Sequence, residues 1–419
     1  METLEAYLNR KSLEISLLNH CLNSPLSIQP PRTPTDVIKH KFQIVSALKA
    51  EHAIQDWAIT ETAWAHPGTK RAGPFEFSYD YQRADLEVRG PSFYAFEYPD
   101  LHDTIYTSSG MSAISAILLA SAKVIPSADI MVLPGSYGET LELLDSYIHH
   151  LRKVQLPVEE IAAVGEKPRI LLLDSSSPFD SIEAALCCLL PRLDLVVFDT
   201  TCFSSSSGRI GRVVRWARRF GLPVVMIRSH TKLDSLGVEY GRLGSAVFVD
   251  AKSSVETPRR AILQLLANET RQAVRLFGGA AIPAHFPPFA GNARYRLLTD
   301  SRIASILRNS RRTSRSLAQT LKVASGQLHS FHGLYLTLSP AQDIDESQAR
   351  QIAHELSSDL TKLGMPLRHA GSFGFDFGAT EWFHDTISNR YLVRVAVPDL
   401  PTALWDEVAN AIAVWWSSH

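Results

Sequence analysis

The sequence predicts an α/β protein with three layers, in which a mostly parallel central sheet lies between helices, plus a smaller C-terminal α+β domain. Short apolar runs alternate with helix-like stretches up to about residue 250, the pattern of a parallel sheet covered on both faces. Beyond about residue 255, long helical regions are interrupted by single strand-like runs. We therefore expect an N-terminal helical segment at 1–60, a large α/β domain at 61–255 and the α+β domain at 256–419.

The elements follow in order along the chain. The N-terminal segment has helical patterns with a proline-rich break from Pro25 to Pro34, and we expect it to pack over the body of the protein or over a partner subunit. Strands of the large domain are predicted at Ile130–Leu133, Arg169–Leu173, Leu193–Phe198, Leu222–Ile227 and Ser245–Val249. Helices between them are predicted at Glu139–Leu151, Ser181–Leu190 and Arg209–Phe220.

The C-terminal domain has longer helices and fewer strands. Its helices are predicted at Pro258–Leu276, Arg296–Leu321, Glu346–Leu363 and Leu404–Trp416, and its strands at Leu334–Leu338 and Tyr391–Val397. Three prolines between Pro283 and Pro288 predict a loop near the start of this domain.

Composition excludes several function classes. A net charge of -1 over 419 residues gives no basic surface for nucleic acid. The longest apolar runs, such as Ala184–Leu190, are far shorter than the roughly 20 residues that cross a bilayer. Four cysteines show neither paired nor metal-ligand spacing. We expect a cytoplasmic protein with no metal, no membrane partner and no nucleic-acid partner.

Polar side chains end three of the predicted strands. Asp174 to Pro178, Asp199 to Thr201 and Ser229 to Lys232 each follow an apolar run. Ligands of parallel sheets bind at the carboxyl ends of the strands. Polar residues at strand ends are, however, often only caps of the helices that follow. A lysine among apolar residues has a lowered pKa, and its neutral amine can form a Schiff base with an aldehyde. A single such lysine is more often an ordinary surface residue.

Two further stretches could bind an anion. Ser109, Gly110 and Met111 precede an apolar helix, where free amides can cap the helix or bind phosphate. Tyr81 and Arg83 could clamp a phosphate, because a guanidinium matches two of its oxygens, or could simply pack. Neither stretch has the glycine pattern of a dinucleotide or nucleoside triphosphate loop.

Taken together, these stretches resemble the Cys/Met-metabolism family of pyridoxal phosphate (PLP) enzymes, which includes cystathionine γ-synthase and cystathionine γ-lyase. The resemblance covers roughly residues 75 to 419 and implies that the chain is a divergent member of the family. It rests on motifs in a fixed order, at Tyr81–Arg83, Ser108–Ala113, Ser136–Thr140, Asp199–Thr201, Ser229–Lys232, Gly371–Gly374 and Val393–Val397. It implies PLP fold type I, PLP as the cofactor, an amino-acid substrate, and a homodimer or homotetramer with shared active sites.

The resemblance also implies roles for single residues. Lys232 would carry the cofactor as a Schiff base and move protons, Asp199 would keep the pyridine nitrogen protonated, and Tyr137 would stack on the ring and assist proton transfer. The phosphate would be held by Ser109, Gly110, Met111, Ser229 and Thr231, with Tyr81 and Arg83 from a neighbouring subunit. Ser177 would lie near the ring oxygen, and Arg394 with Ser372 would bind the substrate α-carboxylate.

The chain departs from the family near the substrate. Ser177 precedes Pro178 where the family has asparagine, and Thr200 follows Asp199 where asparagine is usual. The first hypothesis is γ-replacement or γ-elimination on an L-amino acid in a specialised biosynthetic pathway. Two alternatives stay open: an aminotransferase or another fold type I reaction, and a catalytically inactive scaffold. Retention of both Lys232 and Asp199 argues against the scaffold.

Overall fold

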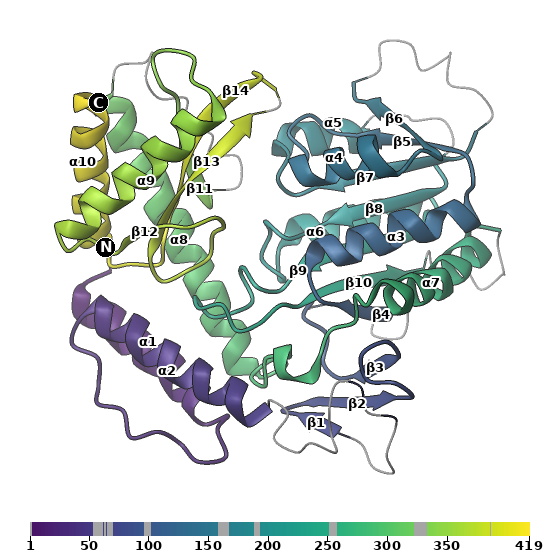
Figure 1. Cartoon of the computed structure of the whole chain (residues 1–419), viewed down its shortest axis with the longest axis horizontal. Helices are drawn as coiled ribbons and strands as arrows, with labels where there is room; N and C mark the ends of the chain where they lie inside the picture. The colour runs from purple at the N-terminus through teal and green to yellow at the C-terminus, as the bar shows by residue number, and fades with distance from the viewer. Residues whose placement is uncertain are drawn as a thin grey trace. The chain divides into compact units, whose positions relative to one another are not determined.

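Figure 1 shows a computed structural model of the chain, which describes residues 2–52, 62, 64, 70–95, 102–157, 167–187, 193–250, 258–321, 333–385 and 387–419. The chain forms two compact units. We call Met1–Glu51, Lys232–Tyr240 and Gly291–His419 the lysine unit, and His52–Thr231 with Gly241–Ala290 the sheet unit. The domain boundaries expected near 60 and 255 lie outside the described residues, and the three-part division stays a prediction.

The sheet unit is built on seven strands in the order β4-β10-β9-β8-β7-β5-β6. Neighbours from β9 through β6 pair in parallel, whereas β10 is antiparallel to both of its neighbours. The mostly parallel sheet predicted from the sequence is confirmed. The strands are β4 (His102–Thr107), β5 (Ala128–Val132), β6 (Leu151–Gln155), β7 (Arg169–Asp174), β8 (Leu195–Asp199), β9 (Val224–Ser229) and β10 (Gly244–Val249).

Helices cover both faces of this sheet (Figure 1). Successive residues of an inner strand point to opposite faces, so Ile170 and Leu172 pack into one hydrophobic cluster and Leu171 and Leu173 into the other. The first cluster includes residues of α3 (Gly110–Val124), α4 (Gly138–Tyr147) and α7 (Pro258–Phe277). The second includes residues of α5 (Phe179–Cys187) and α6 (Gly208–Arg219).

A small antiparallel sheet also belongs to the sheet unit. It consists of β1 (Lys70–Ala72), β2 (Phe75–Tyr79) and β3 (Leu86–Arg89). Phe75 and Phe77 are buried and both pack against Phe286, which follows the 3-10 turn η3 (Pro283–His285). The proline-rich loop expected at 283–288 therefore contributes to this aromatic core.

The lysine unit combines helices with a four-stranded sheet in the order β11-β14-β13-β12. This matches the α+β character expected for the C-terminal region, and Met1–Glu51 belong to the same unit. Its helices are α1 (Leu4–Asn19), α2 (Pro34–His52), α8 (Ala293–Thr320), α9 (Glu346–Lys362) and α10 (Thr402–Ser418). Its strands are β11 (Tyr335–Leu338), β12 (Leu367–His369), β13 (Gly378–Asp385) and β14 (Arg390–Ala396).

Sequence patterns missed the more polar strands. The helix predicted at Glu139–Leu151 ends at Tyr147, and Leu151 begins β6, an edge strand in which only Leu151 is buried. Such a strand lacks the continuous apolar run that marks an inner strand. Among the helices that the structure describes, none has the length and apolar character needed to cross a membrane.

Candidate active site

Two acidic side chains end neighbouring parallel strands of the sheet unit. Asp174 ends β7 and Asp199 ends β8, and the two residues are directly paired in register. Both are at least nine-tenths buried. The Asp174 carboxylate accepts hydrogen bonds from the backbone N–H of Tyr137 and of Ser176, each at 2.8 Å. Asp174 thereby fixes the turn that carries Tyr137 to the start of α4.

The pKa of Asp174 is raised to about 7. Burial is the largest cause, and the negative charge of Asp199 adds to it, while the two backbone hydrogen bonds act in the opposite direction. Two neighbouring buried carboxylates disfavour each other's ionisation. A cationic group beside this pair would favour the ionised form of both carboxylates.

Asp199 is linked to the end of the next strand through Thr201. The backbone N–H of Thr201 donates to Oδ1 of Asp199 at 2.8 Å, and the Thr201 hydroxyl accepts from the backbone N–H of Ser229 at 3.0 Å. One residue thus ties the carboxylate that ends β8 to the hydroxyl-bearing residue that ends β9.

The first turn of α3 has backbone N–H groups that find no acceptor within the helix. Ser109 caps it, because its hydroxyl accepts from the backbone N–H of Ser112 at 3.0 Å, and the N–H of Ala113 bonds to the Ser109 carbonyl. The geometry of an α-helix gives the amides of Gly110 and Met111 no acceptor within the helix. Together with the helix dipole, these two amides favour an anion.

Glycines bring this helix start against the sheet. A Cβ added at Gly110 would lie 3.1 Å from the Cβ of Ser229, and one added at Gly244 would overlap the Ser109 carbonyl group. The backbone of α3 can approach β9 and β10 this closely only because both positions lack a side chain. The backbone amides at the start of α3 therefore lie directly beside Ser229 at the end of β9.

Two more predicted residues follow strands of the same sheet. Ser177 is buried, with its backbone N–H donating to the Asp174 carbonyl at 3.1 Å and its hydroxyl 3.4 Å from that of Ser136. The Thr231 hydroxyl donates to the Gly241 carbonyl at 3.2 Å.

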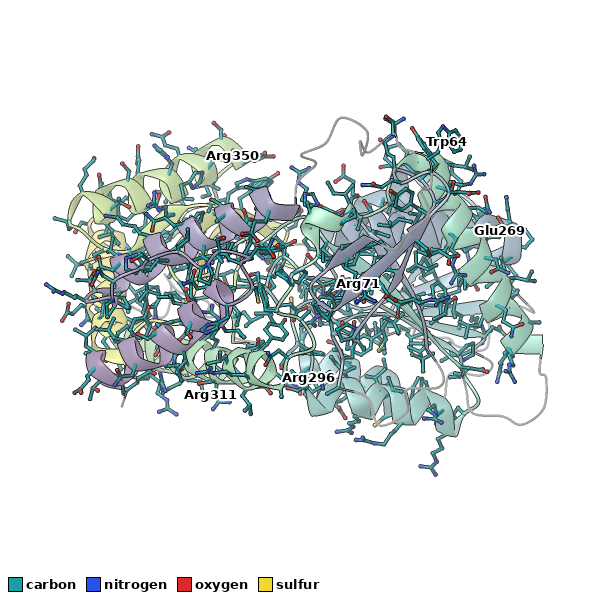
Figure 2. All side chains as sticks on the ribbon, turned by 90° about the horizontal axis from the view of Figure 1, so that it is seen from below. Trp64, Arg71, Glu269, Arg296, Arg311 and Arg350 are labelled. Atoms are coloured by element: carbon teal, nitrogen blue, oxygen red, sulfur yellow. The ribbon has the colours of Figure 1, made fainter. Side chains whose placement is uncertain are left out.

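Tyr81 and Arg83 lie elsewhere in the sheet unit, in the turn between β2 and β3. The exposed guanidinium of Arg83 lies 5.5 Å from the centre of the Tyr81 ring, and Tyr81 packs against Trp64 at 5.4 Å. Figure 2 shows Trp64 among the side chains that project outward, and it is 71% exposed. No contact among the described residues joins this pair to the start of α3.

Lys232 begins a loop of the lysine unit. Its Nζ lies 4.9 Å from the centre of the buried Phe373 ring, and the Ser235 hydroxyl donates to its carbonyl at 3.1 Å. The face of an aromatic ring at this distance attracts an ammonium group. The lowered pKa expected for this lysine stays a prediction.

Arg394 lies in the same unit on β14, paired in register with Glu381 on β13. Its Nε donates to Oε1 of Glu381 at 2.8 Å, and its Nη2 contacts the same oxygen. The backbone N–H of Ser372 donates to that oxygen at 3.0 Å. The pKa of Arg394 is raised, because the charge of Glu381 and the neighbouring Tyr335 outweigh the burial that would lower it. The predicted carboxylate-binding arginine thus already contacts a carboxylate of the chain.

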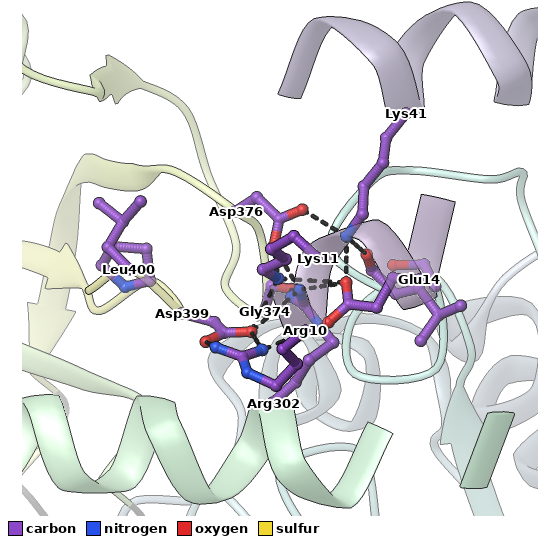
Figure 3. Close-up of polar contacts among 12 residues, drawn as sticks. Arg10, Lys11, Glu14, Lys41, Arg302, Gly374, Asp376, Asp399 and Leu400 are labelled. Carbon is purple, nitrogen blue, oxygen red and sulfur yellow. Dashed lines mark hydrogen bonds and ion pairs between the residues drawn. The ribbon is translucent and has the colours of Figure 1, made fainter. Parts of the chain in front are cut away.

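A buried cluster of charges also belongs to the lysine unit (Figure 3). Lys11 bonds to Asp376 at 2.7 Å and to Asp399 at 2.8 Å, and Lys41 bonds to Asp376 at 2.6 Å. We call the six members that are at most 2% exposed the ion cluster: Lys11, Lys41, Arg302, Glu14, Asp376 and Asp399. Among these six, three cations meet three anions. At the edge of the ion cluster Arg10, which is 12% exposed, bonds to Asp399 at 2.6 Å and to Glu14 at 3.3 Å, and it also pairs with Glu2 at 2.9 Å.

The ion cluster holds the loop that follows Lys232. Lys41 on α2 donates to the Leu236 carbonyl at 2.7 Å, and the backbone N–H of Asp376 donates to the Gly237 carbonyl at 3.0 Å. Arg302 on α8 donates to the Gly374 carbonyl at 2.9 Å. The N-terminal helices, to which the sequence assigned no chemistry, therefore anchor the loop that begins with Lys232.

These residues fit a phosphorylated cofactor with a basic ring nitrogen. The start of α3 and Ser229 offer donors for a phosphate, and the carboxylate pair offers a place for a cation. In the part of the chain that the structure describes, no three His, Cys, Asp or Glu side chains are grouped so that they could hold a metal ion.

No family model matches the sequence, and no curated protein matches it. Solved structures are similar to it. A cystathionine gamma synthase from Xanthomonas oryzae pv. oryzae, in complex with cystathionine, is 17% identical with a TM-score of 0.52, over 93% of this chain and 99% of that one. The metB protein from Corynebacterium glutamicum is 14% identical with a TM-score of 0.53, over 90% and 98%. This likeness is one of fold, and the predicted fold class, PLP fold type I, is confirmed.

Proposed function

We propose that the protein is a PLP-dependent enzyme that acts at the β- or γ-carbon of an L-amino acid, by γ-replacement or γ-elimination. The observation that carries the proposal is the carboxyl edge of the seven-stranded sheet. There the amides that start α3 lie against Ser229, and Thr201 links Ser229 to the buried Asp199. Lys232 follows three residues after Ser229 in the sequence.

The cofactor phosphate would bind where the donors gather. The amides of Gly110 and Met111 would donate to it along the helix dipole. The remaining hydrogen bonds to the phosphate would come from the hydroxyl groups of Ser109, Ser229 and Thr231. As the resemblance implies, Tyr81 and Arg83 would complete the site of a neighbouring subunit in a homodimer or homotetramer.

When bound, PLP supplies an aldehyde that links to an amine and a ring that accepts electrons from the substrate. Asp199 would hold a proton on the ring nitrogen, and Asp174 beside it would add negative charge. Lys232 would hold the cofactor and then move protons at the substrate carbons. Tyr137, fixed through its backbone to Asp174, would stack on the ring, and Ser177 would donate near the ring oxygen.

The test uses purified protein supplied with PLP and a panel of γ-substituted amino acids, including O-acylhomoserines, cystathionine, methionine and S-adenosylmethionine, each offered both as the free acid and as its α-carboxamide. Product mass spectra in deuterated water should show exchange at both the α- and the β-carbon. An aminotransferase would instead accumulate the amine form of the cofactor, and an inactive scaffold would turn over no substrate. Either result would contradict the proposed γ-chemistry.

A further inference from the structure

Arg394, which is proposed to bind the substrate, forms an ion pair that the sequence did not predict. The inference drawn from it rests on the proposed function. Arg394 and Glu381 face each other on neighbouring strands of one sheet, with Nε and Oε1 2.8 Å apart. A cross-strand pair of opposite charges is set by the register of the sheet, so it does not depend on a mobile loop.

The neighbouring backbone holds Glu381 in place. Ser372 donates its N–H to Oε1 of Glu381 at 3.0 Å, with φ at 102°, a left-handed conformation that residues other than glycine rarely adopt. Such strain persists only where the surroundings impose it, and it is most common at functional sites. Gly371 leaves room for the carboxylate, because a Cβ there would lie 2.9 Å from Oε2 of Glu381.

The pair lies among aromatic rings close to Lys232. The guanidinium of Arg394 is 4.4 Å from the centre of the Tyr335 ring, which packs against Phe373 at 6.3 Å. Lys232 in turn lies 4.9 Å from the Phe373 ring, so aromatic contacts connect the lysine with the arginine inside one unit. The side chains of Arg394 and Glu381 are only 13% and 17% exposed.

Charge decides what this place can accept. Arg394 and Glu381 together are neutral, and a free substrate carboxylate would add a second negative charge beside Glu381 in a largely desolvated position. Burying a charge without a counter-charge is costly, and two carboxylates that share one guanidinium repel each other. A neutral carbonyl oxygen can accept a hydrogen bond from Arg394 and adds no charge.

We propose that Glu381 is a specificity-determining residue that neutralises Arg394. The substrate is then an amino acid whose carboxyl group is uncharged, as an ester, amide or thioester. This departs from the expectation that Arg394 with Ser372 binds a free α-carboxylate. It names the class of substrate while leaving the proposed chemistry at the β- or γ-carbon as it stands.

The experiment compares two probes on protein loaded with PLP, L-alanine and L-alaninamide, with affinities measured by isothermal titration calorimetry. The probes differ at the carboxyl group, and comparing the ratio of their affinities between variants cancels the difference in amine basicity. Glu381→Gln keeps an oxygen acceptor for the Ser372 N–H but removes the charge. It should raise the affinity for L-alanine by about tenfold or more and change that for L-alaninamide by less than about threefold.

Two further variants sharpen the test. Glu346→Gln alters an exposed Glu–Arg pair of the same unit, with Arg350, and should leave both affinities unchanged. Adding Arg394→Met to Glu381→Gln should abolish the gain for L-alanine, because the gain requires the unmasked guanidinium.

An unchanged ratio in Glu381→Gln, or a loss of L-alanine affinity, would mean that Glu381 orients Arg394 for a free carboxylate, and the inference would be wrong. Failure of the proposed function looks different. In that case the wild-type protein binds no PLP, which its visible absorbance reveals before any probe is added.

Discussion

The ion cluster and the carboxyl edge of the seven-stranded sheet both bury charge, but they balance it differently. In the ion cluster three cations face three anions, and the pKa of Asp376 is lowered because Arg302, Lys11 and Lys41 outweigh the effect of its burial. At the edge two carboxylates lie side by side, and the pKa of Asp174 is raised to about 7. Removing one partner from a balanced set of buried charges is costly, whereas a buried carboxylate with a raised pKa beside a second carboxylate is typical of functional sites.

The largest expected effect comes from unbalancing the ion cluster. Asp376→Asn leaves three buried cations facing two anions, and we expect the free energy of unfolding to fall by about 3–5 kcal/mol. Denaturant unfolding followed by circular dichroism measures it. The double variant Asp376→Asn with Lys41→Met restores the balance and should recover part of the loss; a purely additive loss would refute charge balance as the cause.

At the carboxyl edge of the seven-stranded sheet, a substitution should lower catalytic turnover more than it lowers stability. Asp199→Ala removes the group proposed to keep the ring nitrogen protonated, so turnover by PLP-loaded protein should drop by about a hundredfold or more. Steady-state kinetics on the best substrate of the panel measures the drop, with thermal unfolding as the control for folding. Near-normal turnover would mean that a group other than Asp199 keeps the ring nitrogen protonated.

The two regions should also respond to pH in opposite directions. The folded-state pKa of Asp174 lies above its ordinary value of 3.8, so the folded protein binds more protons between pH 4 and 7, and stability falls as pH rises through that window. The slope is at most about 1.4 kcal/mol per pH unit. In the ion cluster the pKa values of Asp376 and Asp399 are lowered, so its contribution is lost as pH falls below about 4.

Unfolding measured from pH 4 to 8 checks this. The slope between pH 4 and 7 should shrink in Asp174→Asn, whatever the baseline stability of that variant. A slope that is identical in the wild type and in Asp174→Asn would remove Asp174 as its source.

The smallest effect provides the baseline. Glu269 on α7 pairs with Lys123 on α3 at 2.7 Å, and the lysine side chain is 67% exposed. Glu269, labelled in Figure 2, is a surface charge screened by water, so Glu269→Gln should change stability by less than about 1 kcal/mol. A loss as large as that of Asp376→Asn would mean that burial does not separate the two kinds of ion pair.

The inner strands and the polar residues that end them could be predicted from the sequence. Their apolar runs are continuous and end abruptly, at Asp199 in β8 and at Arg228 and Ser229 in β9. Asp174 was visible as a strand end, but its pairing with Asp199 depends on which strands are neighbours. Glu381 gave no signal, because β13 mixes polar and aromatic residues without a regular alternation and its partner is set by sheet register.

The ion cluster was equally hidden. Lys11 and Lys41 lie in helices whose polar residues look solvent-exposed, and Asp376 is more than 300 positions away from both. Only the tertiary fold brings them to the loop that begins with Lys232.

Reduction of the PLP-loaded protein with borohydride, followed by peptide mass spectrometry, shows whether Lys232 carries the cofactor. We expect a stable phosphopyridoxyl adduct on the peptide that contains Lys232, and none in Lys232→Ala. An adduct on another lysine, or an equal yield from Lys232→Ala, would contradict it.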